Sequence, residues 1–81
     1  MYQTIGEHIE VIGIYKNHSF KPVKFQWQGR THGIDQITQV AELRDGSVKS
    51  RMYSVMSKGN LYRLLFHRET EQWKLEEMWM E

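Results

Sequence analysis

The chain has 81 residues, of which 40% are hydrophobic and 12% aromatic, and it contains no Cys. This length accommodates one domain, residues 1–81, and disfavours a deep, enclosed active site, because a small domain buries a limited share of its surface. The apolar content excludes a disordered chain. The lack of Cys excludes a disulfide framework and any thiolate nucleophile or ligand.

The chain carries no recognisable export or membrane signal. Residues Met1 to Gly6 lack the basic and apolar regions of a secretory signal. No segment approaches the run of about 18 apolar residues that a membrane span requires. We therefore expect a cytoplasmic protein that does not contact a membrane.

Two strands are predicted in the first third of the chain. Residues 8–15 are rich in β-branched side chains, and Gly13 predicts a bulge there. In residues 22–28, Val23, Phe25 and Trp27 alternate with polar residues, which predicts a strand with one apolar face. Pro22 suits the first position of this strand because it cannot donate a backbone hydrogen bond.

Residues 31–43 are the ambiguous part of the sequence. The dipeptide Gly29-Arg30 predicts a tight turn that leads into them. Apolar residues from Ile34 to Ala41 recur at spacings of three and four, as in a helix, but many of the residues are β-branched and favour a strand. A bent strand is slightly favoured, and one short helix over residues 31–43 is the alternative.

The remaining segments are predicted to be strands joined by short turns. Asp45-Gly46 predicts a type I′ hairpin into a strand near Val48 to Met56. Alternating apolar residues predict further strands over 61–67 and 73–79. The fold class is therefore all-β: an antiparallel meander of about six strands that forms a strongly twisted sheet or a small barrel.

Large apolar side chains are expected on both faces of the last two strands. In residues 61–67, Leu61 and Leu65 lie on the face opposite Tyr62, Leu64 and Phe66, and Met78 and Met80 are expected opposite Trp79. Closure of a barrel within the chain is one way to cover them. The other is a surface for a protein partner or a homodimer, formed by Leu61, Leu65, Met78 and Met80.

Charge is unevenly distributed along the chain. Residues 16–68 contain ten basic and three acidic residues, whereas the two ends contain seven acidic residues and one basic residue. Terminal strands can lie side by side in a meander, which would create a basic face and an acidic edge. A nucleic acid could bind such a face, although the net charge of +1 makes it a weak candidate. The candidate contacts are Lys24, Arg30, Arg51 and Arg63 for phosphates and Tyr53 for base stacking.

The chemistry-bearing residues form no catalytic or metal motif. The histidines His8, His18, His32 and His67 show no spacing typical of a metal pair. A nucleophile elbow, a phosphate-binding Gly-rich loop and a carboxylate pair with a proton-transfer partner are all missing from the sequence. We expect a protein that is not an enzyme and that uses no metal or cofactor.

One set of motifs extends over most of the chain. Residues 22–30 carry P-x-x-F-x-W-x-G-R, and the later motifs are Y-x-V at Tyr53 and Val55, Tyr62-Arg63-Leu64, and Trp73-Lys74-Leu75-Glu76. With these motifs the chain resembles a small family of uncharacterised bacterial domains, from about Ile9 to the end. It differs from that family between Val40 and Arg51, where many members have a longer, Trp-rich insertion.

The resemblance implies a link to DNA repair, because some members are associated with Y-family translesion DNA polymerases. It also implies that Trp27, Gly29 and Arg30 form a signature turn. Of these, Trp27 suits the core and Gly29 the turn geometry, so Arg30 is the residue we expect to be exposed. The exposed strand faces and the Gly29-Arg30 turn lead us to expect a non-catalytic protein-interaction module, whose ligand is an unknown protein partner or a second copy. The alternative, which the resemblance implies, is a nucleic-acid-binding accessory domain linked to DNA repair or translesion synthesis.

Overall fold

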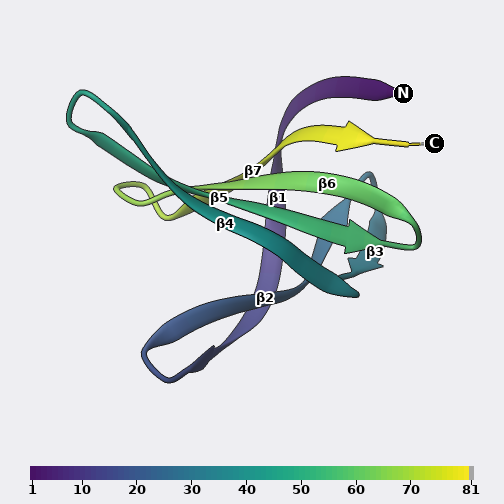
Figure 1. Cartoon of the computed structure of the whole chain (residues 1–81), viewed down its shortest axis with the longest axis horizontal. Helices are drawn as coiled ribbons and strands as arrows, with labels where there is room; N and C mark the ends of the chain where they lie inside the picture. The colour runs from purple at the N-terminus through teal and green to yellow at the C-terminus, as the bar shows by residue number, and fades with distance from the viewer. Residues whose placement is uncertain (81) are drawn as a thin grey trace.

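The computed structural model describes residues 1–80, which form one antiparallel sheet of seven strands in the order β3-β2-β1-β7-β6-β5-β4 (Figure 1). The prediction of an all-β, strongly twisted antiparallel fold is confirmed, in the form of a sheet that does not close into a barrel. The strands are β1 (Tyr2–Lys16), β2 (Ser19–Trp27), β3 (Arg30–Gly33), β4 (Gln36–Asp45), β5 (Val48–Ser57), β6 (Asn60–His67) and β7 (Gln72–Trp79).

The sheet has seven strands rather than six because residues 31–43 are divided between β3 and β4. The helix considered for these residues is absent, and residues 1–80 contain no helix at all. At the division, the Ile34 N–H donates to the Val23 carbonyl at 2.9 Å, and the Asp35 N–H donates to the Met56 carbonyl at 2.8 Å. Two neighbouring residues, Ile34 and Asp35, thus bind β2 and β5, which belong to opposite halves of the sheet. We call these two residues the junction.

The hairpin predicted at Asp45-Gly46 is present, but its turn lies one residue later. Asp45 ends β4, and the two turn residues are Gly46 and Ser47. Of these two turn residues, only Gly46 has a positive φ, of 62°. A single positive φ at the first turn position is typical of a type II′ turn, so the predicted type I′ turn is wrong.

The predicted Gly29-Arg30 turn is also shifted by one residue. Its turn residues are Gln28 and Gly29, with φ values of 52° and 71°, and Arg30 is the first residue of β3. Two positive φ values match a type I′ turn, whose backbone twist suits the flanking strands.

β1 joins the two halves of the sheet. Its first part, from Tyr2 to Ile9, pairs with β7, and its second part, from Glu10 to Lys16, pairs with β2. The bulge predicted at Gly13 is present as a register shift between Ile12 and Gly13, but its extra residue lies in β2, because Ile12 pairs with Lys24 and Gly13 with Pro22. The two acidic terminal strands therefore lie side by side.

The sheet curls strongly enough that its inner face forms the core. Phe25 of β2 and Tyr62 of β6 have ring centroids 5.2 Å apart, although β1 and β7 lie between their strands in the sheet. Such a contact requires the two halves of the sheet to face each other. The buried hydrophobic core consists of Phe25, Tyr53, Val55, Tyr62, Leu64, Leu75 and Met78.

A transmembrane helix is not found among residues 1–80.

Candidate binding site

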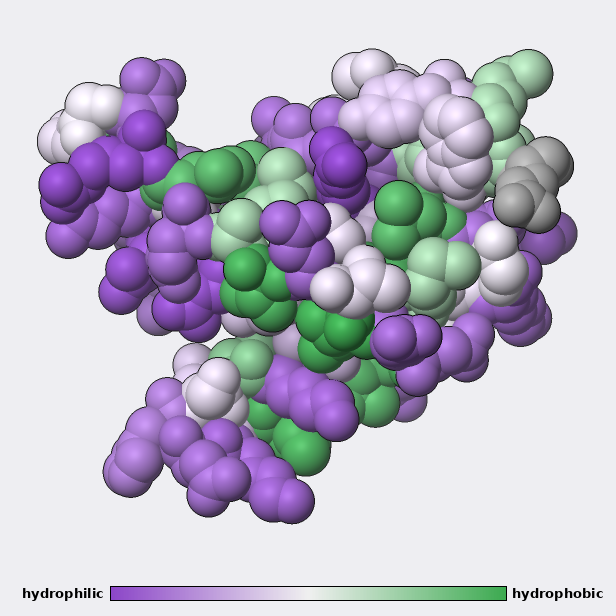
Figure 2. All heavy atoms as spheres, in the orientation of Figure 1, coloured by the Kyte–Doolittle hydropathy of each residue, from purple (hydrophilic) through white to green (hydrophobic). Residues whose placement is uncertain are grey.

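A recess lies between two hairpins that diverge from the junction. The β1–β2 hairpin and the β4–β5 hairpin point away from each other on one side of the molecule (Figure 1), and the space-filling view shows a hollow between these two hydrophilic arms, with hydrophobic residues behind it (Figure 2). Within it is a cavity of about 150 Å³, which we call the aromatic cavity. Its lining residues are Tyr15, His18, Phe20, Arg51, Tyr53, Phe66 and Trp73.

Strand register brings these residues to one face. Tyr15 pairs with Phe20 across the β1–β2 hairpin, and Phe66 pairs with Trp73 across β6 and β7. Arg51 of β5 pairs with Phe66 from the other side. Partners in an antiparallel pair share a face, so each pairing places two lining residues together.

The aromatic rings contact one another around Trp73. Its ring centroid lies 4.9 Å from Phe66, 5.3 Å from Tyr53 and 5.8 Å from Phe20. These separations are typical of attractive aromatic pairs. Tyr15 contacts Phe20 at 5.3 Å but is 80% exposed, so most of its ring is free. The cavity therefore has a fixed aromatic wall and one exposed ring at its entrance.

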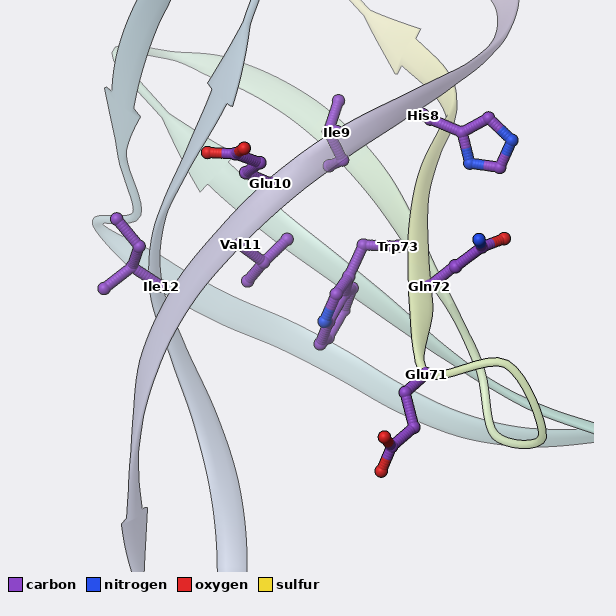
Figure 3. A pocket seen from close by; sticks show the side chains of 8 residues that line it. All are labelled: His8, Ile9, Glu10, Val11, Ile12, Glu71, Gln72 and Trp73. Carbon is purple, nitrogen blue, oxygen red and sulfur yellow. The ribbon is translucent and has the colours of Figure 1, made fainter.

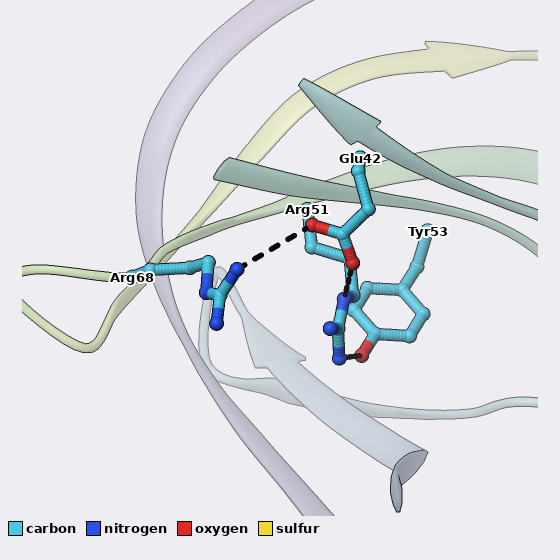
Figure 4. Close-up of polar contacts among 4 residues, drawn as sticks. All are labelled: Glu42, Arg51, Tyr53 and Arg68. Atoms are coloured by element: carbon cyan, nitrogen blue, oxygen red, sulfur yellow. Dashed lines mark hydrogen bonds and ion pairs between the residues drawn. The ribbon is translucent and has the colours of Figure 1, made fainter. Parts of the chain in front are cut away.

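A chain of polar contacts extends from the rim into the cavity (Figure 4). The Arg51 side chain donates to the Glu42 carboxylate and, at 3.4 Å, to the Tyr53 hydroxyl. Arg68 lies on the other side of Glu42, with 3.9 Å between its Nη1 and the Glu42 Oε2. The Tyr53 hydroxyl and the Glu42 carboxylate together raise the pKa of Arg51, so the guanidinium stays positively charged.

A larger and more open hollow of about 520 Å³ lies where β1 separates from β7. Figure 3 shows the Val11 and Trp73 side chains directed into the space between the two strands, whereas His8 and Gln72 point away from it. Trp73 thus lines both this hollow and the aromatic cavity. Because β1 changes its partner from β7 to β2 near Ile9, the hollow follows from the strand pairing.

The residues predicted to bind a ligand lie on different surfaces. Arg51 and Tyr53 are brought together in the aromatic cavity. Lys24 lies on the opposite face of β2 from Phe25, and Arg63 pairs with Glu77 on the outer face, with 3.3 Å between the Arg63 Nη1 and the Glu77 Oε2. Arg30 lies in the β2–β3 hairpin and does not line the cavity. The four basic residues therefore do not form one phosphate-binding surface.

The role expected for Tyr53 in base stacking is wrong. Tyr53 is only 3% exposed, and Trp73 packs against it. Its ring therefore has no free face for a base. The hydroxyl is the part that reaches Arg51.

The predicted partner surface is also divided. Leu61 and Leu65 lie half-buried on the outer face of β6. Met78, however, is 5% exposed and belongs to the core, so its assignment to a partner surface is wrong. Met80, which follows β7, is 36% exposed.

Several lining residues were not singled out from the sequence as site residues: Tyr15, His18, Phe20, Phe66 and Trp73. A signal for two of them was present, because Phe66 and Trp73 flank the turn at residues 68–71 at positions that pair when the hairpin closes. The meeting of Phe20 with Trp73 depends on the curl of the sheet, which no local pattern specifies.

Within residues 1–80, the His, Asp and Glu side chains form no group of three or more that could hold a metal ion. Comparison with family models, curated proteins and solved structures gives no match for this chain. The resemblance to the family with the F-x-W-x-G-R motif, and the link to translesion polymerases, therefore stay predictions. Any functional assignment depends on the geometry of the recess.

Proposed function

We propose that the protein is a non-catalytic protein-interaction module that binds its partner in the recess between the β1–β2 and β4–β5 hairpins. The observation that carries this proposal is the aromatic cavity, which combines a packed aromatic wall with an Arg and an 80% exposed Tyr15. Aromatic residues and Arg are enriched where proteins bind each other, because they contribute large contact areas and directed hydrogen bonds.

The position of the cavity also supports a macromolecular ligand. It opens between two projecting hairpins, so a ligand could contact both arms as well as the aromatic wall (Figure 2). A volume of about 150 Å³ is smaller than that of a typical small-molecule pocket, which is about 300–1,000 Å³. It suits one side chain of a partner whose other residues lie along the recess.

Site-specific photocrosslinking tests this function. Benzoylphenylalanine at Tyr15 places the reactive group at the cavity entrance, and the same group at Ile14 places it on the opposite face of the same strand, because successive side chains alternate. In a lysate of the source organism, we expect a discrete protein adduct from position 15 that is missing from position 14. The purified adduct partner should then bind the wild-type domain and bind the Arg51→Ala variant more weakly. Identical adducts from both positions, or no adduct from position 15, would contradict the proposal.

A nucleic-acid ligand is the second candidate, because Arg51 lies among the aromatic residues of the cavity and shares its contact with Glu42 with a second cation, Arg68. Fluorescence anisotropy of labelled single- and double-stranded oligonucleotides, at low and moderate salt, tests it. Binding that is saturable, weakens steeply with salt and is reduced by Arg51→Ala would favour this candidate. Lack of binding at low salt would exclude it.

A further inference from the structure

We propose that the ligand of the recess is an extended, acidic segment of a partner protein. This segment pairs as an additional strand with the free edge of β4, the edge that does not pair with β5. This inference rests on the proposed function and specifies its ligand. Three features of the recess carry it: an unpaired strand edge, the geometry of the junction and the distribution of charge.

The first feature is the unpaired edge of β4. β4 is a terminal strand of the sheet and pairs only with β5 among residues 1–80. In an antiparallel edge strand, alternate residues direct their N–H and C=O groups away from the sheet, where they can pair with another chain. A bulge lies between Ile37 and Gln39, so the regular part of the edge comprises residues 39–45. Addition of a partner strand to such an edge is a common mode of peptide recognition.

The second feature is the junction, which places another incompletely paired strand opposite this edge. β3 covers only the part of β2 from Lys24 to Trp27. The residue before this part, Val23, accepts a hydrogen bond at its carbonyl from the Ile34 N–H of the junction. From this point β2 and β4 diverge (Figure 1). A hollow of about 440 Å³ lies at this closed end of the recess. An added strand would therefore lie between the two strands, with every second side chain directed toward the aromatic cavity.

The third feature is positive charge at the open end. Register pairs Glu42 with Arg51 and Arg44 with Lys49, and residues two apart in a strand share a face. Arg44 and Lys49 therefore lie on the same face as Arg51, and Arg68 joins them through Glu42 and through its backbone N–H, which donates to the Lys49 carbonyl at 3.1 Å.

Two of these four cations, Arg51 and Arg68, contact the Glu42 carboxylate, whereas among residues 1–80 Arg44 and Lys49 form no ion pair. The surplus of positive charge selects Asp or Glu side chains in the ligand, because charge complementarity stabilises the correct partner and disfavours a basic one. A second copy of β4 would bring Arg44 toward the same cluster. An acidic segment is therefore the ligand that these charges fit.

The test uses the purified domain and a random octapeptide library displayed on phage. We expect the selected octapeptides to be enriched in Asp and Glu, and the synthetic form of the strongest binder to slow amide hydrogen exchange in residues 39–45. N-methylation of the alternate peptide residues that face β4 should weaken binding by about tenfold or more, because it removes the donors of the new ladder. N-methylation of the intervening peptide residues, whose N–H groups point away from β4, should have a much smaller effect.

Charge variants complete the test. Arg44→Glu with Lys49→Glu should weaken binding of the acidic octapeptide by about tenfold or more. Lys24→Glu, a single charge reversal on the face of β2 opposite Phe25, should leave it nearly unchanged. The two Glu substitutions lie in an exposed hairpin, and circular dichroism would verify that the variant folds.

Three outcomes would overturn the inference. If the peptides bind in the cavity but neither N-methylation pattern matters, the strand-addition model is wrong while the proposed function stands. If the selected peptides are neutral or basic, the charge assignment is wrong. If a single-stranded oligonucleotide binds the recess at moderate salt and no peptide does, the ligand is a nucleic acid, and the proposed function fails as well.

Discussion

The ring of Phe20 lies directly over Gly13, at the bulge where β1 and β2 change register. A Cβ atom added at Gly13 would be 2.5 Å from the Phe20 Cζ and 2.3 Å from the Lys21 carbonyl oxygen. The lack of a side chain at Gly13 therefore lets Phe20 turn toward Trp73 and form one wall of the aromatic cavity. The glycine is needed for space, since its φ is not in the positive region.

The first prediction is that Gly13→Ala destabilises the protein by about 1–3 kcal/mol, because an overpacked site forces the ring and the backbone to shift. Gly33→Ala is a matched control, since an added Cβ at Gly33 meets no atom within 4 Å and its φ is also not positive. Urea unfolding of the two variants measures the difference in the free energy of unfolding. Equal stabilities would show that the close contact at Gly13 relaxes without cost.

The second prediction compares two methionines near the end of the chain. Met78→Ala should cost about 2–5 kcal/mol, because it leaves a cavity in the core where Met78 is 5% exposed. Met80→Ala removes the same group from a position that is 36% exposed and should cost much less. Thermal or urea unfolding of both variants gives the comparison. A loss of association without a loss of stability in Met78→Ala would instead restore Met78 to a partner surface.

The error over Met78 shows where sequence patterns lose their predictive value. Period-two alternation places Trp73, Leu75 and Trp79 on one face. The structure instead pairs Arg63 with Glu77 and Leu64 with Leu75, so Glu76 is an extra residue in β7. The bulge reverses the alternation after Leu75, which turns Met78 into the core and Trp79 to the outer face.

The same effect operates in β2. Ile12 pairs with Lys24 and Gly13 pairs with Pro22, so Val23 is the extra residue. Val23 is consequently exposed although it alternates with Phe25 and Trp27, and Pro22 is buried instead. Gly13 signals the bulge in the sequence, but the alternation within β2 does not show that Val23 is the extra residue, because that depends on how the two strands pair.

The aromatic cavity depends on long-range structure to a still greater degree. Local alternation correctly groups Tyr62, Leu64 and Phe66 on one face of β6, and the chain order predicts antiparallel neighbours. The contact of Phe20 with Trp73, however, joins β2 to β7 across the intervening β1. Only the curl of the whole sheet creates it, so the sequence predicts the fold class more completely than the site.

The third prediction concerns the junction. The Lys58 N–H in the β5–β6 turn donates to the Asp35 Oδ2 at 2.9 Å, and this bond links the junction to the turn. Asp35→Ala removes the acceptor and should cost about 0.5–1.5 kcal/mol, the usual contribution of an accessible hydrogen bond. For a domain of this size, about 1 kcal/mol lowers the melting temperature by about 4–8 °C.

Asp35→Asn is the matched control for this prediction, because its side chain keeps an oxygen acceptor at the same position. It should melt closer to the wild-type protein than Asp35→Ala does, as measured by circular dichroism. If the two variants melt together below the wild type, the negative charge of Asp35 matters and the hydrogen bond does not.

The fourth prediction is a pH dependence of stability caused by His32. Its ring stacks on Phe25 with centroids 5.0 Å apart, next to Tyr62 and Trp27. Burial lowers the pKa of His32 below the ordinary 6.5, and the nearby positive charge of Lys58 lowers it further. As the pH falls through 6.5, the unfolded chain binds a proton before the folded chain does, so the free energy of unfolding decreases until the folded His32 is also protonated.

His32→Phe keeps an aromatic ring in the stack and removes the titration. We expect urea midpoints measured at pH 7.5, 6.5 and 5.5 to fall more for the wild-type protein than for this variant, and an NMR titration to place the His32 pKa below 6.5. Parallel decreases in the two proteins would assign the acid sensitivity to other groups. Because the His32 ring stacks on Phe25 of the core, a larger loss in the wild type would assign the acid sensitivity of the whole domain to this ring.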